Sequence, residues 1–241
     1  MSGVLNGQKV VVFGGGSGAG LASAKLLASK GAEVIVTGRS LDKMEAARKE
    51  GLTAKAVDGR DVPAVRAFFD ELGAFDHLVL TAGQTNRGGS FTDEITEEKF
   101  RETFDGKFWV QVNAAHAAAR HIKKGGSITF FSGGANRRAL RGMANIAAVN
   151  AAIDGIVPTL ALELAPTRVN SISPGTLRTT YWTGVPEAAL EQIFDRTAKG
   201  LLAGRVGTPE DIANAVLFLV TTSFVTGTVL AVDGGVPHSS L

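Results

Sequence analysis

Residues Val10–Gly20 read Val-Val-Val-Phe-Gly-Gly-Gly-Ser-Gly-Ala-Gly and join an apolar run to a loop that contains five glycines. The apolar-rich segment Leu21–Ala28 follows directly, so the order predicts a buried strand, a tight turn and a helix. Glycine allows positive φ and close approach to the backbone. A helix N-terminus presents unpaired N–H groups and partial positive charge, which suit a phosphate. Glycine-rich turns also occur without a ligand, so the interpretation depends on the rest of the chain.

Composition excludes several classes of function. The 241 residues are 44% hydrophobic and 20% charged, which is typical of one domain over residues 1–241. Cysteine is absent, so disulfides and thiolate chemistry are excluded. Net charge is only +2, with no long basic run, which disfavours nucleic-acid or membrane binding. We expect a soluble cytoplasmic protein, because we find neither a signal peptide nor an apolar run near ~20 residues. The histidines form no metal-ligand pattern: His77, His116, His121 and His238.

Short apolar segments alternate with helical patterns along the whole chain. Expected strands are Val10–Phe13, Glu33–Thr37, Thr53–Val57, His77–Thr81, Ser127–Phe131, Thr167–Ile172 and Val229–Val232. Expected helices include one from Leu41 with Ser40 as N-cap, a long apolar one at 144–164, and one beginning at Thr208-Pro209. The alternation predicts an α/β fold, a doubly wound seven-stranded parallel sheet with helices on both faces. Residues 176–204 contain no expected strand and are interpreted as a lid over the carboxyl ends of the strands.

Further motifs follow at matching spacings. They are Leu80-Thr81-Ala82-Gly83, Arg168-Val169-Asn170, Ser173-Pro174-Gly175 with Thr179, Gly204–Ala213, and Thr226-Gly227 with Val232–Gly235. In this order the chain resembles the short-chain dehydrogenase/reductase family over essentially its full length. The resemblance implies a single Rossmann-type domain that binds a nicotinamide dinucleotide across the strand ends, in a homodimer or homotetramer. One departure is Phe13, which stands where the family usually has a threonine that braces the loop.

The resemblance also implies which residues contact the dinucleotide. The pyrophosphate would lie against Gly14, Gly16, Ser17, Gly18, Ala19 and Gly20, and the adenine against Asp58. Ala82 and Gly83 would pass the adenosine ribose, Asn150 stands at the family lysine position beside the other ribose, and Pro174, Gly175 and Thr179 would hold the nicotinamide end. NAD binders usually place a carboxylate after the second strand. Arg39 and Ser40 stand there instead and suit the 2′-phosphate of NADP(H), unless Arg39 only faces solvent.

The family's catalytic residues are all replaced. Its serine, tyrosine and lysine positions fall on Gly133, Ile146 and Asn150, and its helix asparagine falls on Lys107. Lys107 and Asn150 are therefore the family's asparagine and lysine exchanged, and an ammonium could occupy a similar volume from the opposite helix. Ser132, beside Gly133, and Tyr181, the only tyrosine, are further catalytic candidates.

These replacements leave two main interpretations and a third possibility open. In the first, the protein is an NADP(H)-dependent oxidoreductase acting on a small carbonyl or alcohol with an atypical active site. In the second, it is a catalytically silent NADP(H)-binding protein or redox sensor. A lyase or isomerase that uses the nucleotide structurally is a third possibility. The loop residues Asn136, Arg137, Arg138 and Arg141 are interpreted as solvated, with capture of an anionic or phosphate-bearing ligand as the alternative. Tyr181, Trp182 and Trp109 are interpreted as packing groups.

Overall fold

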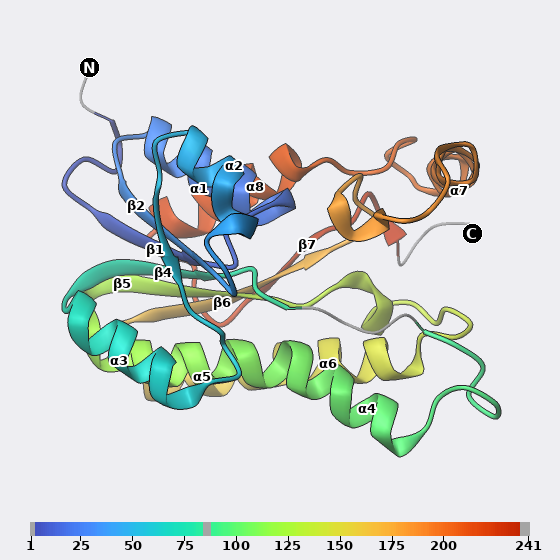
Figure 1. Ribbon diagram of the computed structural model, residues 1–241, viewed down its shortest axis with the longest axis horizontal. Coiled ribbons are helices and arrows are strands. Elements are labelled where there is room, and N and C mark those ends of the chain that lie inside the picture. Colours follow the sequence, from blue (N-terminus) through green and yellow to red (C-terminus); the bar gives the residue numbers. More distant parts are fainter. Residues whose placement is uncertain (1–2, 84–87, 237–241) are drawn as a thin grey trace.

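All seven strands of the described residues run parallel in one sheet with the order β3-β2-β1-β4-β5-β6-β7 (Figure 1). This computed structural model describes residues 3–83 and 88–236, so His238 lies outside the described residues. The strands are β1 (Lys9–Phe13), β2 (Glu33–Gly38), β3 (Thr53–Ala56), β4 (Phe75–Leu80), β5 (Ile122–Phe131), β6 (Arg168–Pro174) and β7 (Val229–Val232). The strand order reverses between β1 and β4, and such sheets bind ligands at the carboxyl ends beside this point.

Helices cover both faces of the sheet (Figure 1). One face carries α1 (Gly18–Ser29), α2 (Glu45–Lys49) and α8 (Pro209–Thr221). The other carries α3 (Val62–Leu72), α5 (Trp109–Ala118) and α6 (Ala144–Glu163), with α4 (Glu97–Thr103) beside α6. Helix α7 (Glu187–Gly200) and the short helix η5 (Thr180–Trp182) lie beyond the carboxyl ends of the strands, within the segment predicted as a lid.

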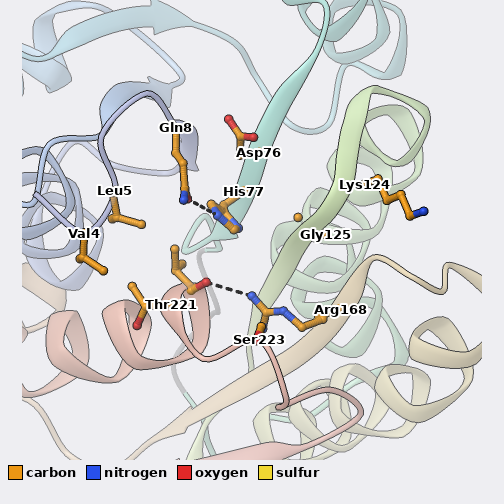
Figure 2. A pocket seen from close by; sticks show the side chains of 12 residues that line it. Val4, Leu5, Gln8, Asp76, His77, Lys124, Gly125, Arg168, Thr221 and Ser223 are labelled. Atoms are coloured by element: carbon orange, nitrogen blue, oxygen red, sulfur yellow. Dashed lines mark hydrogen bonds between the residues drawn. The ribbon is translucent and has the colours of Figure 1, made fainter.

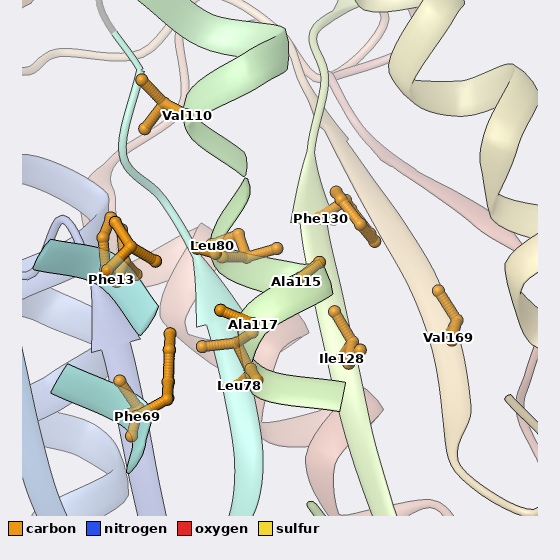
Figure 3. Close-up of a cluster of buried hydrophobic side chains, with 14 of the residues drawn as sticks. Phe13, Phe69, Leu78, Leu80, Val110, Ala115, Ala117, Ile128, Phe130 and Val169 are labelled. Carbon is orange, nitrogen blue, oxygen red and sulfur yellow. The ribbon is translucent and has the colours of Figure 1, made fainter. Parts of the chain in front are cut away.

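Alternating side chains of β1 supply a core to each face. Val11 and Phe13 point toward α3 and α5, where Phe69, Leu80 and Val110 join them (Figure 3). Phe13 is 1% exposed and stacks on Phe69 with ring centroids 6.4 Å apart. The residue that departs from the family pattern is therefore a core residue, and its aromatic ring lies inside the sheet–helix layer rather than at the loop.

Most predicted elements are confirmed with small shifts at their ends. Strand β5 begins at Ile122, five residues before the predicted start. Helix α8 begins as predicted: Asp211 N donates to Thr208 Oγ1 at 3.4 Å, and Thr208 N donates to Asp211 Oδ2 at 2.8 Å. The prediction of Ser40 as an N-cap was wrong. A 3₁₀ turn, η1 (Asp42–Met44), precedes α2, and its cap position is Leu41 in a helical conformation.

Helix α6 is long and apolar enough to cross a membrane by length and composition, with a mean hydropathy of 1.4. The sequence expectation concerned uninterrupted apolar runs, and α6 is interrupted by Asn145, Asn150 and Asp154. Core helices of globular domains pass the same test. Ile146, Val149, Ile153 and Val157 of α6 are buried, and the last two belong to the core beneath β5 and β6.

Candidate functional site

The glycine loop after β1 lies at the switch point of the sheet, and we call this loop and the first turn of α1 the cradle. Gly14 has φ +103°, and a Cβ placed on it would lie 2.4 Å from the Ala82 backbone N, so only glycine lets the loop pass the end of β4. Helix α1 begins at Gly18 with no acidic residue in its first turn and no capping bond from the Ser17 side chain. The first-turn N–H groups suit an anionic group such as a pyrophosphate.

Thr81 braces this loop from the neighbouring strand. Its Oγ1 donates to the Phe13 carbonyl at 3.3 Å, and Ala82 N donates to the same oxygen at 2.7 Å. A Cβ on Gly20 would lie 2.5 Å from Thr81 Oγ1, so α1, the loop and β4 pack closely here. Thr81 thus supplies the hydroxyl that Phe13 cannot. Sequence reasoning had noted Thr81 as part of a motif without assigning it this contact.

Arg39, Ser40 and Asp58 follow the carboxyl ends of β2 and β3. The side chain of Arg60 pairs with Asp58, with NH2 3.2 Å from Oδ2, and Arg60 N donates to Asp58 Oδ1 at 3.0 Å. The Arg60 side chain holds the pKa of the Asp58 carboxyl below its usual range, and the nearby charge of Arg39 acts in the same direction. Arg39 and Asp58 therefore share one edge of the cradle, together with Arg60, which sequence reasoning did not assign.

Lys107 lies in a π-helical turn, η2 (Phe104–Phe108), that joins α4 to α5. Its Nζ donates to the Ser132 carbonyl and to Asn150 Oδ1, both at 2.6 Å. The stem of Lys107 passes Gly83, where an added Cβ would lie 2.9 Å from Lys107 Cγ. Burial lowers the pKa of the Lys107 ammonium to about 8, while the negative charge of Asp154 acts in the opposite direction. π-Helical turns are frequent at functional sites.

Asn150, which accepts from Lys107 Nζ, packs against Gly133. Asn150 lies on α6 and is 2% exposed, and a Cβ on Gly133 would lie 2.9 Å from Asn150 Nδ2. Ile146, one turn earlier on α6, is 8% exposed. The structure thus brings together Lys107, Asn150 and Ser132, and Ile146, which the sequence analysis predicted to stand at the family's tyrosine position, is buried.

A chain of polar side chains continues from this contact behind β5 and β6. Ser132 Oγ lies 3.4 Å from Ser171 Oγ, which donates to Asp154 Oδ1 at 3.0 Å. Asn136 Nδ2 donates to Asp154 Oδ2 at 2.7 Å. Asp154 and Ser171 were missed from the sequence, and Asn136 was assigned only to the loop with Arg137 and Arg138. The one available signal was the position of Asp154, one helical turn after Asn150 on α6.

The aromatic residues of the 176–204 segment pack on one another. Tyr181 is 51% exposed, and its ring meets Trp182 edge-on with centroids 5.2 Å apart. Trp182 in turn meets Phe194 of α7 and donates from Nε1 to the Leu177 carbonyl at 2.9 Å. Arg178 lies over the Phe194 ring, 4.4 Å from its centroid. None of these contacts joins Tyr181 to Lys107, so a catalytic role for Tyr181 stays a prediction.

The predicted nicotinamide end of the cradle follows β6. Gly175 N donates to the Val232 carbonyl at 3.0 Å, and a Cβ on Gly175 would lie 2.7 Å from Asp233 Cα. Thr179 lies at the start of the lid and accepts a 3.3 Å hydrogen bond from Tyr181 N. These contacts hold the ends of β6 and β7 together beside Pro174. No group of three potential metal ligands occurs within residues 3–83 and 88–236.

A cavity of about 260 Å³ lies at the opposite, amino-terminal edge of the sheet (Figure 2). Gln8, Asp76, His77 and Arg168 line it. Arg168 donates to the Leu219, Val220 and Val225 carbonyls at 2.7 to 3.1 Å and so holds the end of α8 on the sheet. Because ligands of parallel sheets bind at the carboxyl ends, this cavity is separate from the cradle.

Comparison with known proteins agrees with this geometry. A family model described as enoyl-(acyl carrier protein) reductase matches residues 14–237. The short-chain dehydrogenase/reductase ATR9 of Stachybotrys chlorohalonatus is 31% identical, covering 96% of this chain and 97% of the relative. The 3-oxoacyl-(acyl-carrier-protein) reductase FabG of Chlamydia muridarum is 32% identical, with coverages of 98% and 99%.

Two solved structures that contain NADPH share the fold. A small-chain dehydrogenase in complex with NADPH has a TM-score of 0.84 at 40% identity, covering 95% of this chain and 97% of that chain. BdcA in complex with NADPH has a TM-score of 0.84 at 29% identity, with coverages of 96% and 95%. The predicted Rossmann-type sheet is therefore confirmed, and this chain belongs to the short-chain dehydrogenase/reductase family.

Proposed function

We propose that this protein is an NADP(H)-dependent oxidoreductase that interconverts a small carbonyl compound and its alcohol. The observation that carries the proposal is the pair of 2.6 Å contacts from Lys107 Nζ at the carboxyl edge of the sheet. This buried ammonium lies beside Gly83, next to the cradle that suits a dinucleotide. A proton donor and a dinucleotide cradle are the two parts that carbonyl reduction needs.

NADP(H) is the proposed coenzyme because Arg39 and Ser40 follow β2 without a carboxylate. The NADPH in two related structures supports this choice. Gly14, Gly18 and the first turn of α1 would hold the pyrophosphate, and Pro174, Gly175 and Thr179 the nicotinamide end. When bound, NADPH supplies a hydride to the carbonyl carbon.

Lys107 would complete the reaction at the carbonyl oxygen. As hydride adds to the carbon, the C=O π electrons move to oxygen, and that oxygen takes a proton from Lys107 Nζ. The neutral amine then regains a proton from solvent. A pKa of about 8 keeps Lys107 mostly protonated at neutral pH and leaves it a better acid than an ordinary lysine. Alcohol oxidation would use the neutral amine as the base.

One observation favours a second candidate function, that of a catalytically silent NADP(H)-binding protein. Ile146, at the family's tyrosine position, is 8% exposed and cannot transfer a proton. In such a protein Lys107 would be a structural cation, and the cradle would bind nucleotide without turnover.

Two measurements on the purified protein separate these functions. Titration of NADPH fluorescence tests binding, and loss of NADPH absorbance with aldehydes, ketones and quinones tests turnover. We expect saturable binding, and turnover that falls about 10²- to 10⁴-fold in Lys107→Met, the range of general acid catalysis. Lys49→Met, on the exposed side of α2, is the matched control. Saturable binding without turnover by any carbonyl would favour the silent protein, and no binding would refute both.

A further inference from the structure

The ammonium of Lys107 fixes the orientation of the Asn150 side-chain amide. An ammonium offers only N–H donors, so the amide must turn its oxygen toward Nζ and its nitrogen away from it. Asn150 as a whole is 2% exposed, yet its Nδ2 donates no hydrogen bond within residues 3–83 and 88–236.

Gly133 leaves the space into which Asn150 Nδ2 points. A Cβ at residue 133 would lie 2.9 Å from Nδ2 and 3.5 Å from Oδ1, closer to the nitrogen than to the oxygen. Any larger residue at 133 would therefore displace the amide nitrogen. The observed orientation of the Asn150 amide therefore depends on glycine at residue 133.

Lys107 Nζ and Asn150 Nδ2 lie close together, and each has an N–H group that is available to a ligand. Lys107 Nζ has three N–H groups and gives two of them to Ser132 O and Asn150 Oδ1. Amide O and N atoms are about 2.2 Å apart, so Nζ and Nδ2 are less than about 5 Å apart. One oxygen atom can therefore accept from both at ordinary distances of about 2.9 Å.

We propose that Asn150 Nδ2, oriented by Lys107 and given room by Gly133, donates a hydrogen bond to the carbonyl oxygen of the substrate and stabilises the negative charge that develops on it. The inference rests on the proposed function, because the oxygen in question is the one that Lys107 protonates. Asn150 then acts as a catalytic residue in its own right, and the ligand class is a carbonyl compound small enough to place its oxygen between Gly133 and Lys107.

The test uses the full chain and the carbonyl compound that the wild-type protein reduces fastest. Four variants are compared: Asn150→Ala, Asn150→Ser, Gly133→Ala, and the double variant Gly133→Ser with Asn150→Ala. NADPH fluorescence titration and thermal unfolding establish which variants fold and bind coenzyme. Turnover is then measured, together with binding of the same carbonyl compound to the complex with NADP⁺, in which no hydride can be transferred.

We expect turnover at saturating NADPH to fall about 10²- to 10³-fold in Asn150→Ala and Gly133→Ala, the usual effect of losing one such donor. Carbonyl binding to the NADP⁺ complex weakens less than turnover does. The double variant, in which a serine hydroxyl replaces the amide donor, is expected to turn over at least ~10-fold faster than Asn150→Ala, a coupling that two independent structural defects would not produce.

Turnover of Asn150→Ala within 3-fold of wild type, or a double variant no faster than Asn150→Ala, overturns the inference. If Asn150→Ala does not fold, Asn150→Ser and Gly133→Ala give the same decision. Failure of the proposed function is distinguishable, because the wild-type protein itself would then reduce no carbonyl compound.

Discussion

His77 makes the stability of this protein depend on pH in a defined window. It lies in β4 and is 4% exposed, with Nδ1 2.8 Å from Ser127 Oγ and Nε2 2.8 Å from Gln8 Oε1 (Figure 2). Burial, followed by the charge of Arg168, lowers the pKa of His77 to about 4, although the Asp76 carboxylate acts in the opposite direction. The folded protein therefore holds His77 neutral under conditions in which the unfolded chain protonates it.

The sign and size of the effect follow from this difference. The folded pKa lies below the ordinary value of 6.5, so the unfolded state binds the proton first as pH falls. Stability from neutral His77 is complete above about pH 6.5 and is lost progressively down to about pH 4. Each pKa unit is worth about 1.36 kcal/mol, so the full loss approaches about 3 kcal/mol, of which about 2 kcal/mol falls between pH 7 and pH 5.

The assay is urea unfolding at pH 7 and pH 5, followed by tryptophan fluorescence. In His77→Gln we expect the loss of unfolding free energy between these pH values to be about 2 kcal/mol smaller than in the wild type. The control is His121→Gln, because His121 contacts Asp70 rather than the partners of His77. Its Nε2 lies 3.0 Å from Asp70 Oδ1. If His77→Gln loses as much stability as the wild type over this range, the buried neutral state of His77 is refuted.

Three more predictions concern the coenzyme, the proton donor and a helix cap. Lys107 has a pKa of about 8 and donates a proton as the ammonium, so the rate of carbonyl reduction should fall as pH increases through about 8. The rate of alcohol oxidation should rise over the same range. In pH–rate profiles Lys107→Met should lose both dependences. Arg39→Ala should weaken NADPH binding about 10-fold or more in fluorescence titrations and leave NADH binding nearly unchanged, since only NADPH carries the 2′-phosphate. Thr208→Ala should remove the cap of α8 and cost about 0.5–2 kcal/mol in urea unfolding, whereas Thr221→Ala at the other end of α8 should cost less.

The sheet could be predicted from the sequence because its strands carry near-continuous apolar runs such as Val10–Phe13, which are buried on both faces. The start of α2 could not, because Ser40 has the chemistry of an N-cap while Leu41 already adopts helical angles. Strand β5 was shortened in prediction because its first part, Ile122–Gly126, is polar and glycine-containing. Local patterns thus predicted the elements, and their ends depended on neighbours that are distant in sequence.

The sequence predicted individual residues of the candidate site, but not the contacts between them. Alignment with the family motif placed Lys107 and Asn150 at exchanged positions, but it gave no reason for Gly133. A Cβ at residue 133 would lie 2.9 Å from Asn150 Nδ2, and this contact between the loop after β5 and helix α6 cannot be predicted from residue spacing. Asp154 was missed for the same reason, since its partners Asn136 and Ser171 come from a loop and from β6.

The energetics of Lys107 bear on whether the site is active. Lowering its pKa from 10.5 to about 8 corresponds to about 3 kcal/mol of free energy spent on holding the charge in the fold at neutral pH. A methionine would fill a similar volume without the cost of desolvating a charge. A site without a ligand has no physical need for a desolvated ammonium, nor for the glycines that give room to its stem, at Gly83, and to its amide partner Asn150, at Gly133. We infer that the ammonium is retained for an interaction with a ligand, which is why Lys107→Met separates the two candidate functions: in the silent protein it should stabilise the fold or leave it unchanged without affecting any reaction.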